Sequence, residues 1–535
     1  MSAYKFSMPL VALDVDQVFQ RALALHQRGE LDQARSLYEE VLRLQPTHAD
    51  ALQFLGAIEL HFNRPERAID FISRSIAINR QNPGCYLNLG NAQKELLRYD
   101  AAIKSYDEAI ALKPDYALAF SNKGVALQMA GCTEVAISCF ERSITLNPSG
   151  FEAFYNLGNL YKDTGRFAAA IASYGEAIVR NKACIDAYLN RSAVFLELKQ
   201  LDAAIESFDQ AIAVDPQCAK AHWNKALVLL LAGHLVNGWE AYEWRWRIGN
   251  YGGRKLRFNQ PVWQDTIPVK GKTVLIHAEQ GLGDTIQFCR YAKLLASRGA
   301  LVVLEVQPPL VDLLQPLTGI SKVLAAGSPL PAFDFQCPLL SMPRAFNTML
   351  ETIPSETAYL HADLEKVRTW AAKLGERKTP RIGLVWSGNK DLIDDHTRSI
   401  ALSALLSHLP SEFDYVSLQK ELRESDAAVL SAGGTVRHFG ADLIDFTDTA
   451  ALCELMDVVI SVDTSVAHLS GALGKKTWVL LSHIPDWRWL LDRSDSPWYP
   501  SVSLYRQTVP AQWGPLLEQV GADLLNMRSL ATSFS

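Results

Sequence analysis

A repeat of 34 residues restricts the fold of this chain more than any other feature of its sequence. Small residues recur at this interval, at Gly56, Gly90, Gly124, Gly158, Ser192 and Ala226. A unit of this length is one supersecondary element that cannot bury its apolar face alone, so neighbouring units must stack on one another. The first half of the chain is therefore predicted to be an array of stacked repeats.

The register of the repeats pairs small residues with large ones. Twelve residues beyond each small residue comes another, and four further on a bulky one: Ile72, Tyr106, Phe140, Tyr174, Phe208 and Tyr242. This pattern predicts seven two-helix repeats over residues 15–250, the last atypical and capping, after an N-terminal extension at 1–14. The segment resembles the tetratricopeptide (TPR) family, whose role is to cradle polypeptide in a groove. The resemblance implies a polypeptide acceptor or partner.

Asparagine also recurs every 34 residues, two positions before the small residue. The row consists of Asn88, Asn122, Asn156, Asn190 and Asn224. Asparagine is a weak helix former, but its amide both donates and accepts, so a row could hold an extended peptide backbone without reading its sequence. Protein O-GlcNAc transferases use such a row. Alternatively, asparagine is simply a common TPR residue here that packs between helices.

Composition narrows the class of protein. A length of 535 residues suggests three or four domains, and 48% apolar residues suffice for several cores. A net charge of −6 provides no global basic field for nucleic acid. The sequence contains no long apolar run and no paired cysteines or histidines with zinc spacing. We therefore expect a cytoplasmic protein with no transmembrane segment, no metal site and no nucleic-acid partner.

Tryptophans gather where the repeat pattern decays. Five of the twelve lie between residues 223 and 263, at Trp223, Trp239, Trp244, Trp246 and Trp263. Aromatic surface at the end of a solenoid is best explained by burial against a neighbouring domain, and a ligand platform is the alternative.

Beyond residue 271, short apolar runs alternate with helical stretches, which predicts βαβ units and parallel sheets. Two such blocks favour two Rossmann-like lobes. The predicted segments are a linker at 251–270, lobes at 271–372 and 379–510, and a C-terminal helix and tail at 511–535. Ligands of such sheets bind beyond the carboxyl ends of the strands.

Three of the predicted strand-end loops carry candidate chemistry. The first contains Gly281, Gly283 and Asp284 at the start of a helix. The glycines permit close backbone approach, and Asp284 is either a helix cap or a catalytic carboxylate. The second loop leads to Arg398, which could clamp phosphate with two parallel donors or could lie solvated at the surface.

The third loop is the most informative. A strand ending at Val462 delivers Asp463, Thr464 and Ser465, and a helix containing His468 follows. The free N–H groups at that helix start, with the hydroxyls, would suit a diphosphate. The alternative is an ordinary capped helix with His468 hydrogen-bonded in the core.

Three further segments are weaker candidates. Gln419 and Lys420 could contact a nucleotide, and Asp448 with Thr449 could line the same site, although either pair could form a plain turn. Residues 485–489, PDWRW, could shape the donor pocket or pack between domains.

These loops together resemble the lipopolysaccharide heptosyltransferase family, which has the GT-B glycosyltransferase fold. GLGDTI at 281–286 and DTSVAH at 463–468 match its two loops, although Ser465 replaces a glycine and HAEQ precedes GLGD. The resemblance implies Asp284 as general base, Asp463 on the sugar, and Arg398, Thr464, Ser465 and His468 on the diphosphate. It implies neither the sugar nor the acceptor. The whole layout also resembles bacterial TPR glycosyltransferases that are similar to O-GlcNAc transferase.

The expected protein is thus a TPR superhelix followed by an α/β GT-B domain with two lobes facing a cleft. Its expected activity is inverting, metal-independent transfer of a sugar from a nucleotide-sugar to a protein recruited by the repeats, with no cofactor. Two alternatives stay open: a lipid-linked or surface polysaccharide acceptor, and a non-catalytic scaffold with a degenerate GT-B domain.

Overall fold

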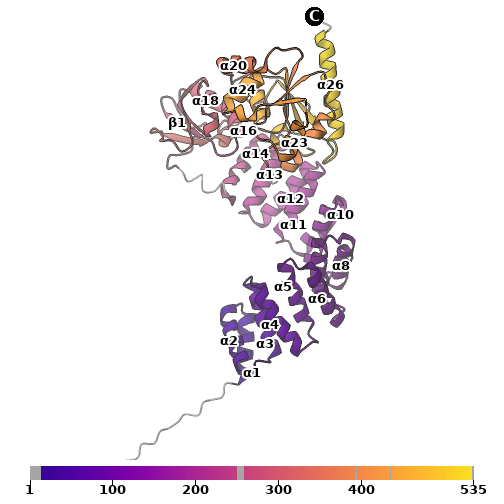
Figure 1. The fold of residues 1–535 in the computed structure, drawn as a ribbon. Helices are drawn as coiled ribbons and strands as arrows, with labels where there is room; N and C mark the ends of the chain where they lie inside the picture. The colour runs from indigo at the N-terminus through magenta and orange to yellow at the C-terminus, as the bar shows by residue number, and fades with distance from the viewer. Residues whose placement is uncertain (1–13, 250–257, 392–394, 434, 533–535) are drawn as a thin grey trace, which may run out of the picture. The chain divides into compact units, whose positions relative to one another are not determined.

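The computed structural model describes residues 14–249, 258–391, 395–433 and 435–532, with side chains described up to Met527. Most of the N-terminal extension predicted at 1–14 and the first part of the linker predicted at 251–270 lie outside these residues. The chain divides into two compact units, one ending at Leu198 and the other starting at Lys199. Figure 1 shows helices up to α14 and mixed helices and strands after it.

Unit 1 consists of helix pairs, as the repeat predicts. The helices are α1 (Val15–Gln27), α2 (Leu31–Leu44), α3 (Ala49–His61), α4 (Pro65–Ile78), α5 (Pro83–Glu95), α6 (Tyr99–Leu112), α7 (Ala117–Met129), α8 (Thr133–Leu146), α9 (Glu152–Asp163), α10 (Phe167–Arg180) and α11 (Ile185–Glu197). The predicted contact of small with large residues is confirmed. A Cβ added to Gly124 would lie 2.8 Å from the Phe140 ring, and one added to Gly158 would lie 2.7 Å from the Tyr174 ring.

Unit 2 begins with the last repeats. They comprise α12 (Leu201–Val214), α13 (Ala219–Leu231), α14 (Leu235–Tyr242) and the 3-10 turn η1 (Glu243–Arg247). Because α14 has only eight residues and passes directly into η1, the last repeat is atypical.

The first lobe contains a parallel sheet with the order β3-β2-β1-β4. Its strands are β1 (Thr273–His277), β2 (Leu301–Val306), β3 (Ile320–Ala325) and β4 (Phe335–Pro338). Its helices and 3-10 turns are α16 (Leu282–Phe288), α17 (Arg290–Ser297), η3 (Pro308–Leu310), α18 (Val311–Leu314), η4 (Leu339–Ser341), α19 (Met342–Ala345) and η5 (Leu350–Thr352), and α20 (Leu364–Leu374) leads to the second lobe.

The second lobe contains a six-stranded parallel sheet with the order β10-β9-β8-β5-β6-β7. Its strands are β5 (Arg381–Val385), β6 (Asp414–Ser417), β7 (Val436–His438), β8 (Val458–Val462), β9 (Thr477–Leu481) and β10 (Val502–Arg506). Its helices and 3-10 turns are α21 (Asp395–Arg398), α22 (Leu402–Leu406), α23 (Glu424–Ser431), η6 (Gly440–Asp442), α24 (Phe446–Glu454), α25 (Ser465–Ala472), η7 (Trp487–Trp489) and α26 (Gly514–Thr532). Numbered within the lobe, this is the 3-2-1-4-5-6 Rossmann order, so two Rossmann-like lobes follow the repeats, as predicted.

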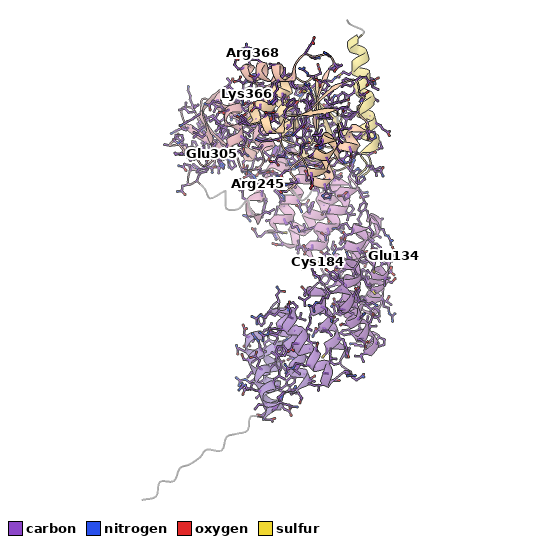
Figure 2. All side chains as sticks on the ribbon, in the orientation of Figure 1. Glu134, Cys184, Arg245, Glu305, Lys366 and Arg368 are labelled. Atoms are coloured by element: carbon purple, nitrogen blue, oxygen red, sulfur yellow. The ribbon has the colours of Figure 1, made fainter. Side chains whose placement is uncertain are left out.

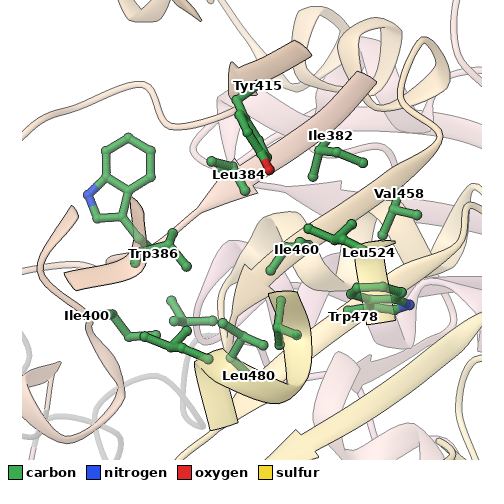
Figure 3. Packing of buried hydrophobic residues seen from close by; sticks show 14 of the residues in the cluster. Ile382, Leu384, Trp386, Ile400, Tyr415, Val458, Ile460, Trp478, Leu480 and Leu524 are labelled. Carbon is green, nitrogen blue, oxygen red and sulfur yellow. The ribbon is translucent and has the colours of Figure 1, made fainter. Parts of the chain in front are cut away.

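Apolar strands explain why the second sheet is buried on both faces. Residues of β5, β6, β8 and β9 pack with the C-terminal α26 into one core (Figure 3), which includes Ile382, Tyr415, Ile460, Leu480 and Leu524. In the Rossmann order, the switch point lies between β5 and β8, and a ligand is expected beyond the carboxyl ends of these two strands.

The tryptophan-rich segment packs inside unit 2. Trp239 is buried edge-on against Trp487 and donates its indole N–H to the Thr348 carbonyl at 3.1 Å. Arg245, also buried, donates to both carboxylate oxygens of Glu279 at 3.0 Å. These contacts support the interpretation of this segment as a joint between the last repeats and the lobes.

No helix within the described residues is long and apolar enough to span a membrane.

Candidate functional site

The candidate site lies where β5 and β8 end, at the switch point of the second sheet. Trp386 and Ser387 follow β5, and Asp463 and Thr464 follow β8. Asp463, Thr464 and Ser465 are partly exposed, whereas Val466 and His468 are buried. The loop residues thus remain accessible while the body of α25 is fixed in the core.

The start of α25 offers unpaired donors. Thr464 is the N-cap in extended conformation, and its side chain does not cap the helix; instead its hydroxyl lies 3.1 Å from the Ser461 hydroxyl. The N–H groups of Ser465 and Val466 have no acceptor within the described residues. First-turn N–H groups carry partial positive charge, so this helix start can bind an anion.

His468 is held in the core beneath this loop. Its Nδ1 lies 2.9 Å from the Tyr499 hydroxyl, and its ring stacks on Trp489. Burial, with Arg488 and Arg290 nearby, lowers the pKa of His468 well below its ordinary value. Its Nε2 lies 3.9 Å from Asp463 Oδ1. His468 is therefore neutral. Its Nδ1 is held in the core, and its Nε2 faces Asp463.

The carboxyl group of Asp463 is unusually easy to protonate. Burial and the neighbouring Asp486 raise the pKa of Asp463 to about 6, against the opposing effects of Arg398 and Arg488. A carboxyl group whose pKa is close to neutral pH can form a hydrogen bond with a hydroxyl group in either protonation state.

Arg398 is a partly buried anchor and not a solvated side chain. It donates from Nη1 to the Asp463 carbonyl at 3.0 Å and from Nε to Asp395 Oδ1 at 3.1 Å. A Cβ on Gly388 would lie 2.7 Å from its Nε, so glycine is needed there to admit the guanidinium. This cation is thus fixed beside the start of α25.

Sequence reasoning missed Arg423 in this cluster. Its Nη2 donates to Asp395 Oδ2 and, at 3.0 Å, to the Ser399 hydroxyl. Nothing in the sequence around it distinguishes it from a solvated arginine, and only the fold brings it to the second loop.

Asp284 is both a helix cap and an ion-paired carboxylate. Its Oδ2 accepts from the Gly281 N–H at 2.7 Å, and its Oδ1 accepts from Arg488, which belongs to the PDWRW segment at 485–489. Burial raises the pKa of Asp284 above its ordinary value, although Arg488 acts in the opposite direction. A more basic carboxylate is better suited to accept a proton at neutral pH.

The structure brings the first and third loops together. A Cβ on Gly283 would lie 2.9 Å from His468 Cδ2 and 3.3 Å from Ser465 Cα. Glycine at this position therefore lets α16 of one lobe pack directly on α25 of the other. Gly281 is exposed and supplies the N–H that holds Asp284.

Gln419 and Lys420 have partners within the protein. Gln419 accepts from the Trp386 and Ser387 N–H groups at 2.7 and 2.9 Å, and its amide donates to the Ser387 hydroxyl and the Glu421 carbonyl. Lys420 is exposed and donates to the Ile444 carbonyl at 3.0 Å. Gln419 therefore links the ends of β5 and β6, and Lys420 lies at the surface.

Asp448 is also engaged by the fold. It accepts from the Trp370 indole N–H at 3.2 Å and pairs with Lys366 at 3.0 Å, and Thr449 beside it is buried.

The asparagines of the repeats fall into two groups. Asn122 donates to Asn91 and Asn190 to Asn159, each at 2.9 Å across neighbouring repeats. Within the described residues, Asn88, Asn156 and Asn224 have no hydrogen-bond partner for their side chains, and all five of the row are partly exposed. Asn122 and Asn190 thus pack between helices, whereas the other three amides are open to a peptide.

A tyrosine accompanies each accepting asparagine. Tyr106 donates to Asn91 at 2.9 Å, and Tyr174 donates to Asn159 at 2.7 Å. Where the repeat has Phe140 as its bulky residue, Val125 stands at the position of the accepting asparagine. A buried hydroxyl needs an acceptor, which explains why tyrosine and asparagine occur together.

Within the described residues, no group of three or more His, Cys, Asp or Glu side chains is arranged to hold a metal ion.

Comparison with known proteins identifies the repeats. Residues 19–83 and 139–172 match the family described as "Tetratricopeptide repeat", and residues 98–131 and 193–233 match "TPR repeat". The chain thus contains tetratricopeptide repeats followed by an α/β region.

Two curated proteins are similar to parts of this chain. The chain is 26% identical to Protein FlbA of Caulobacter vibrioides over 322 residues, 55% of this chain and 53% of FlbA. It is 26% identical to Protein O-mannosyl-transferase TMTC3 of Homo sapiens over 104 residues, 19% of this chain and 11% of TMTC3. The chain therefore spans about half the length of FlbA and about a tenth of TMTC3.

Among solved structures, the one described as "Functional Characterization of Pseudomonas Aeruginosa pilF" is similar to part of this chain. The two chains are 21% identical with a TM-score of 0.35, and the match covers 40% of this chain and 96% of the solved chain.

Proposed function

We propose that this tetratricopeptide-repeat protein is a glycosyltransferase that moves a sugar from a nucleotide-sugar to a polypeptide recruited by its repeats. One observation carries the proposal: the loop with Asp284 packs on the loop with Asp463 and Thr464, through Gly283 against His468. A candidate base from one lobe thus meets a candidate anion site from the other. This arrangement supports transfer between an acceptor and a diphosphate-bearing donor.

In the proposed reaction, the donor diphosphate binds at the start of α25 beside Arg398, and Asp463 contacts the sugar. Asp284 takes the proton of the acceptor hydroxyl while the acceptor oxygen attacks the anomeric carbon. The bond from that carbon to the nucleoside diphosphate breaks, and the configuration inverts. Arg398 and the α25 N–H groups stabilise the negative charge that develops on the leaving group.

The protein's own cations and helix start supply this stabilisation, so we propose that the reaction needs neither a metal ion nor a cofactor. We also propose a cytoplasmic location.

A polypeptide acceptor is supported by the repeats. Three asparagines of the row have side-chain amides without partners in the described part of the chain, and paired donors and acceptors suit a peptide backbone. TMTC3 is named as a protein O-mannosyl-transferase, but its likeness covers a fifth of this chain, so no residue role is taken from it.

Calorimetric titration tests the donor site. The full chain is titrated with UDP, GDP, ADP and CMP and their sugars, beside Arg398→Ala and Thr464→Ala. We expect one nucleotide to bind selectively and at least tenfold more weakly to both variants. Arg368→Ala, which removes an exposed arginine from α20, is the matched control and should bind as wild type does. Absence of binding to wild type, or equal binding by the variants, would contradict the proposal and favour a scaffold.

A further inference from the structure

Arg488, in η7 after β9, is a buried arginine that joins the two lobes. Its Nε donates to Gln287 Oε1 at 2.7 Å and its Nη2 to Asp284 Oδ1, both on α16 of the first lobe. Its Nη1 donates to Asp486 Oδ1 at 2.8 Å in its own lobe. Its guanidinium carbon lies 4.1 Å from the centre of the Trp487 ring. One side chain of the second lobe thus fixes the candidate base of the first.

Burying a cation is costly unless it is paired and hydrogen-bonded. Burial lowers the pKa of Arg488, but Asp486 and Asp284 outweigh this effect and raise it above the ordinary arginine value. Arg488 therefore stays charged inside the protein, and the two flanking carboxylates offset the cost of burying that charge.

The surroundings of Asp284 explain why it needs this partner. Burial and Asp486 favour its protonated form, whereas Arg488 and the Gly281 N–H favour its carboxylate. Tyr242 of α14 also faces it, but burial raises the pKa of Tyr242, so that group is neutral. His468 of α25 is neutral as well, because its pKa lies well below the ordinary value. The compensating positive charge thus comes from Arg488.

The two hydrogen bonds to Asp284 also fix its orientation. One oxygen is held from its own loop by Gly281 and the other from the opposite lobe by Arg488. A carboxylate bound at both oxygens cannot rotate freely, and a general base works only within hydrogen-bond reach of the proton that it removes.

We propose that Arg488 is the positioning residue of the transferase: it holds the Asp284 carboxylate toward the acceptor site and balances its charge from the opposite lobe. This assignment rests on the proposed function, because Asp284 acts as a base only in that reaction. Arg488 itself does not touch the reacting atoms in this proposal.

The first test needs no substrate. Thermal unfolding of full-length wild type, Asp284→Asn, Arg488→Gln and the double variant is followed from pH 4 to 9 by tryptophan fluorescence. All twelve tryptophans follow residue 198, so the signal reports on unit 2. The pH dependence of two differences in melting temperature is compared: wild type against Asp284→Asn, and Arg488→Gln against the double variant. The second difference should titrate about 1–3 pH units higher than the first, because an opposite charge at this range lowers a carboxyl pKa by that amount. The same titration with and without Arg488 would overturn the assignment.

The second test separates positioning from folding. Slow hydrolysis of each UDP-, GDP-, ADP- and CMP-sugar is measured against pH for wild type, Arg488→Gln and Arg488→Lys. We expect Arg488→Gln to lower kcat about 100-fold, leave KM for the donor within twofold, and move the acid limb of kcat to higher pH by about 1–3 units. Arg488→Lys should recover at least tenfold of kcat, because it restores the charge.

The outcomes separate this assignment from the proposed function. If wild type binds no nucleotide, the proposed function fails, and the positioning role fails with it, whatever the unfolding data show. If nucleotide binds and turns over but Arg488→Gln keeps the wild-type kcat and pH profile, the transferase stands and the Arg488 assignment alone is overturned.

Discussion

At the scale of single residues, the proposed donor-site residue Asp463 has a carboxyl group that is costly to ionise in the folded protein. Its carboxyl is mostly buried, and its pKa is raised to about 6 by burial and Asp486. The unfolded chain releases this proton near pH 4, whereas the folded chain holds it until about pH 6. The folded state therefore binds more protons between these values, and its stability falls as pH rises through this window.

We therefore predict that Asp463→Asn stabilises unit 2 above pH 6 and has little effect near pH 4. The gain at pH 8 should be on the order of 1 kcal/mol, because the variant no longer buries a charge. Tryptophan fluorescence during thermal unfolding at pH 4 and 8 measures it. An equal shift at both values would show that ionisation of Asp463 is not the cause. The same variant should lose donor affinity if the carboxylate contacts the sugar.

The candidate residues differ in how far local sequence pattern could mark their place in the site. Asp284, Asp463 and Thr464 follow predicted strands or glycine loops, so local pattern was enough to single them out. Arg488 reaches Asp284 across 204 positions of sequence, and no local pattern marks that contact. Gln419 also follows a strand, but its amide is used to join two strand ends, a role that only the surrounding N–H groups reveal.

At the scale of elements, the repeat helices were predictable because their packing is local. Within each repeat, the glycine of the first helix contacts the bulky residue of the second helix, as Gly158 contacts Tyr174, so residues in contact are also close in sequence. The altered HAEQ turn illustrates the opposite case. Its Glu279 pairs with Arg245 of η1, so this turn serves the joint with the last repeats.

Two glycines of one repeat should respond oppositely to alanine. In Gly158→Ala, the new methyl would meet the Tyr174 ring at 2.7 Å, so we predict a loss of about 1–3 kcal/mol from the free energy of unfolding of unit 1. In Gly175→Ala, nothing lies within 4 Å of the new methyl in α10, so the better helix former should add about 0.5–1 kcal/mol. Circular dichroism at 222 nm during urea unfolding of the full chain measures both. A loss of stability in both variants would contradict the packing described.

The joint makes a separate prediction. Glu279→Gln removes one of the two carboxylates that pair with the buried Arg245, and Glu243 stays 2.8 Å from its Nη1. The loss should therefore be below the roughly 3–5 kcal/mol that breaking a buried pair outright costs. We expect a clear drop in the tryptophan-detected melting temperature. Lys293→Gln, which removes one side of an exposed pair with Glu356, should change that temperature by a degree or less. Equal effects of the two changes would show that the joint contributes little.

At the scale of the whole molecule, the structural boundary falls inside the repeat array. The chain divides at Leu198, and α12 to η1 belong with the lobes through Trp239 and Arg245. A chain that starts at Lys199 keeps these contacts, whereas one that starts at Phe258 exposes the surface that they cover. We predict that residues 199–535 melt within a few degrees of the full chain by tryptophan fluorescence, and that residues 258–535 aggregate or lack a cooperative transition. Equal behaviour of the two pieces would contradict the assignment of α12 to η1 to unit 2.

The same truncation decides what the repeats contribute to the reaction. If they recruit a polypeptide, residues 199–535 should bind the donor as tightly as the full chain and yet glycosylate protein acceptors at least tenfold more slowly. In the full chain, Asn88→Ala with Asn156→Ala should reduce protein glycosylation in part, because these side chains have no partner in the described structure, and should leave donor affinity and melting unchanged. Labelled donor and mass spectrometry of the modified cellular proteins provide the measurement. Undiminished acceptor glycosylation after truncation would instead indicate that the repeats bind an assembly partner and that the acceptor is a lipid-linked or surface glycan.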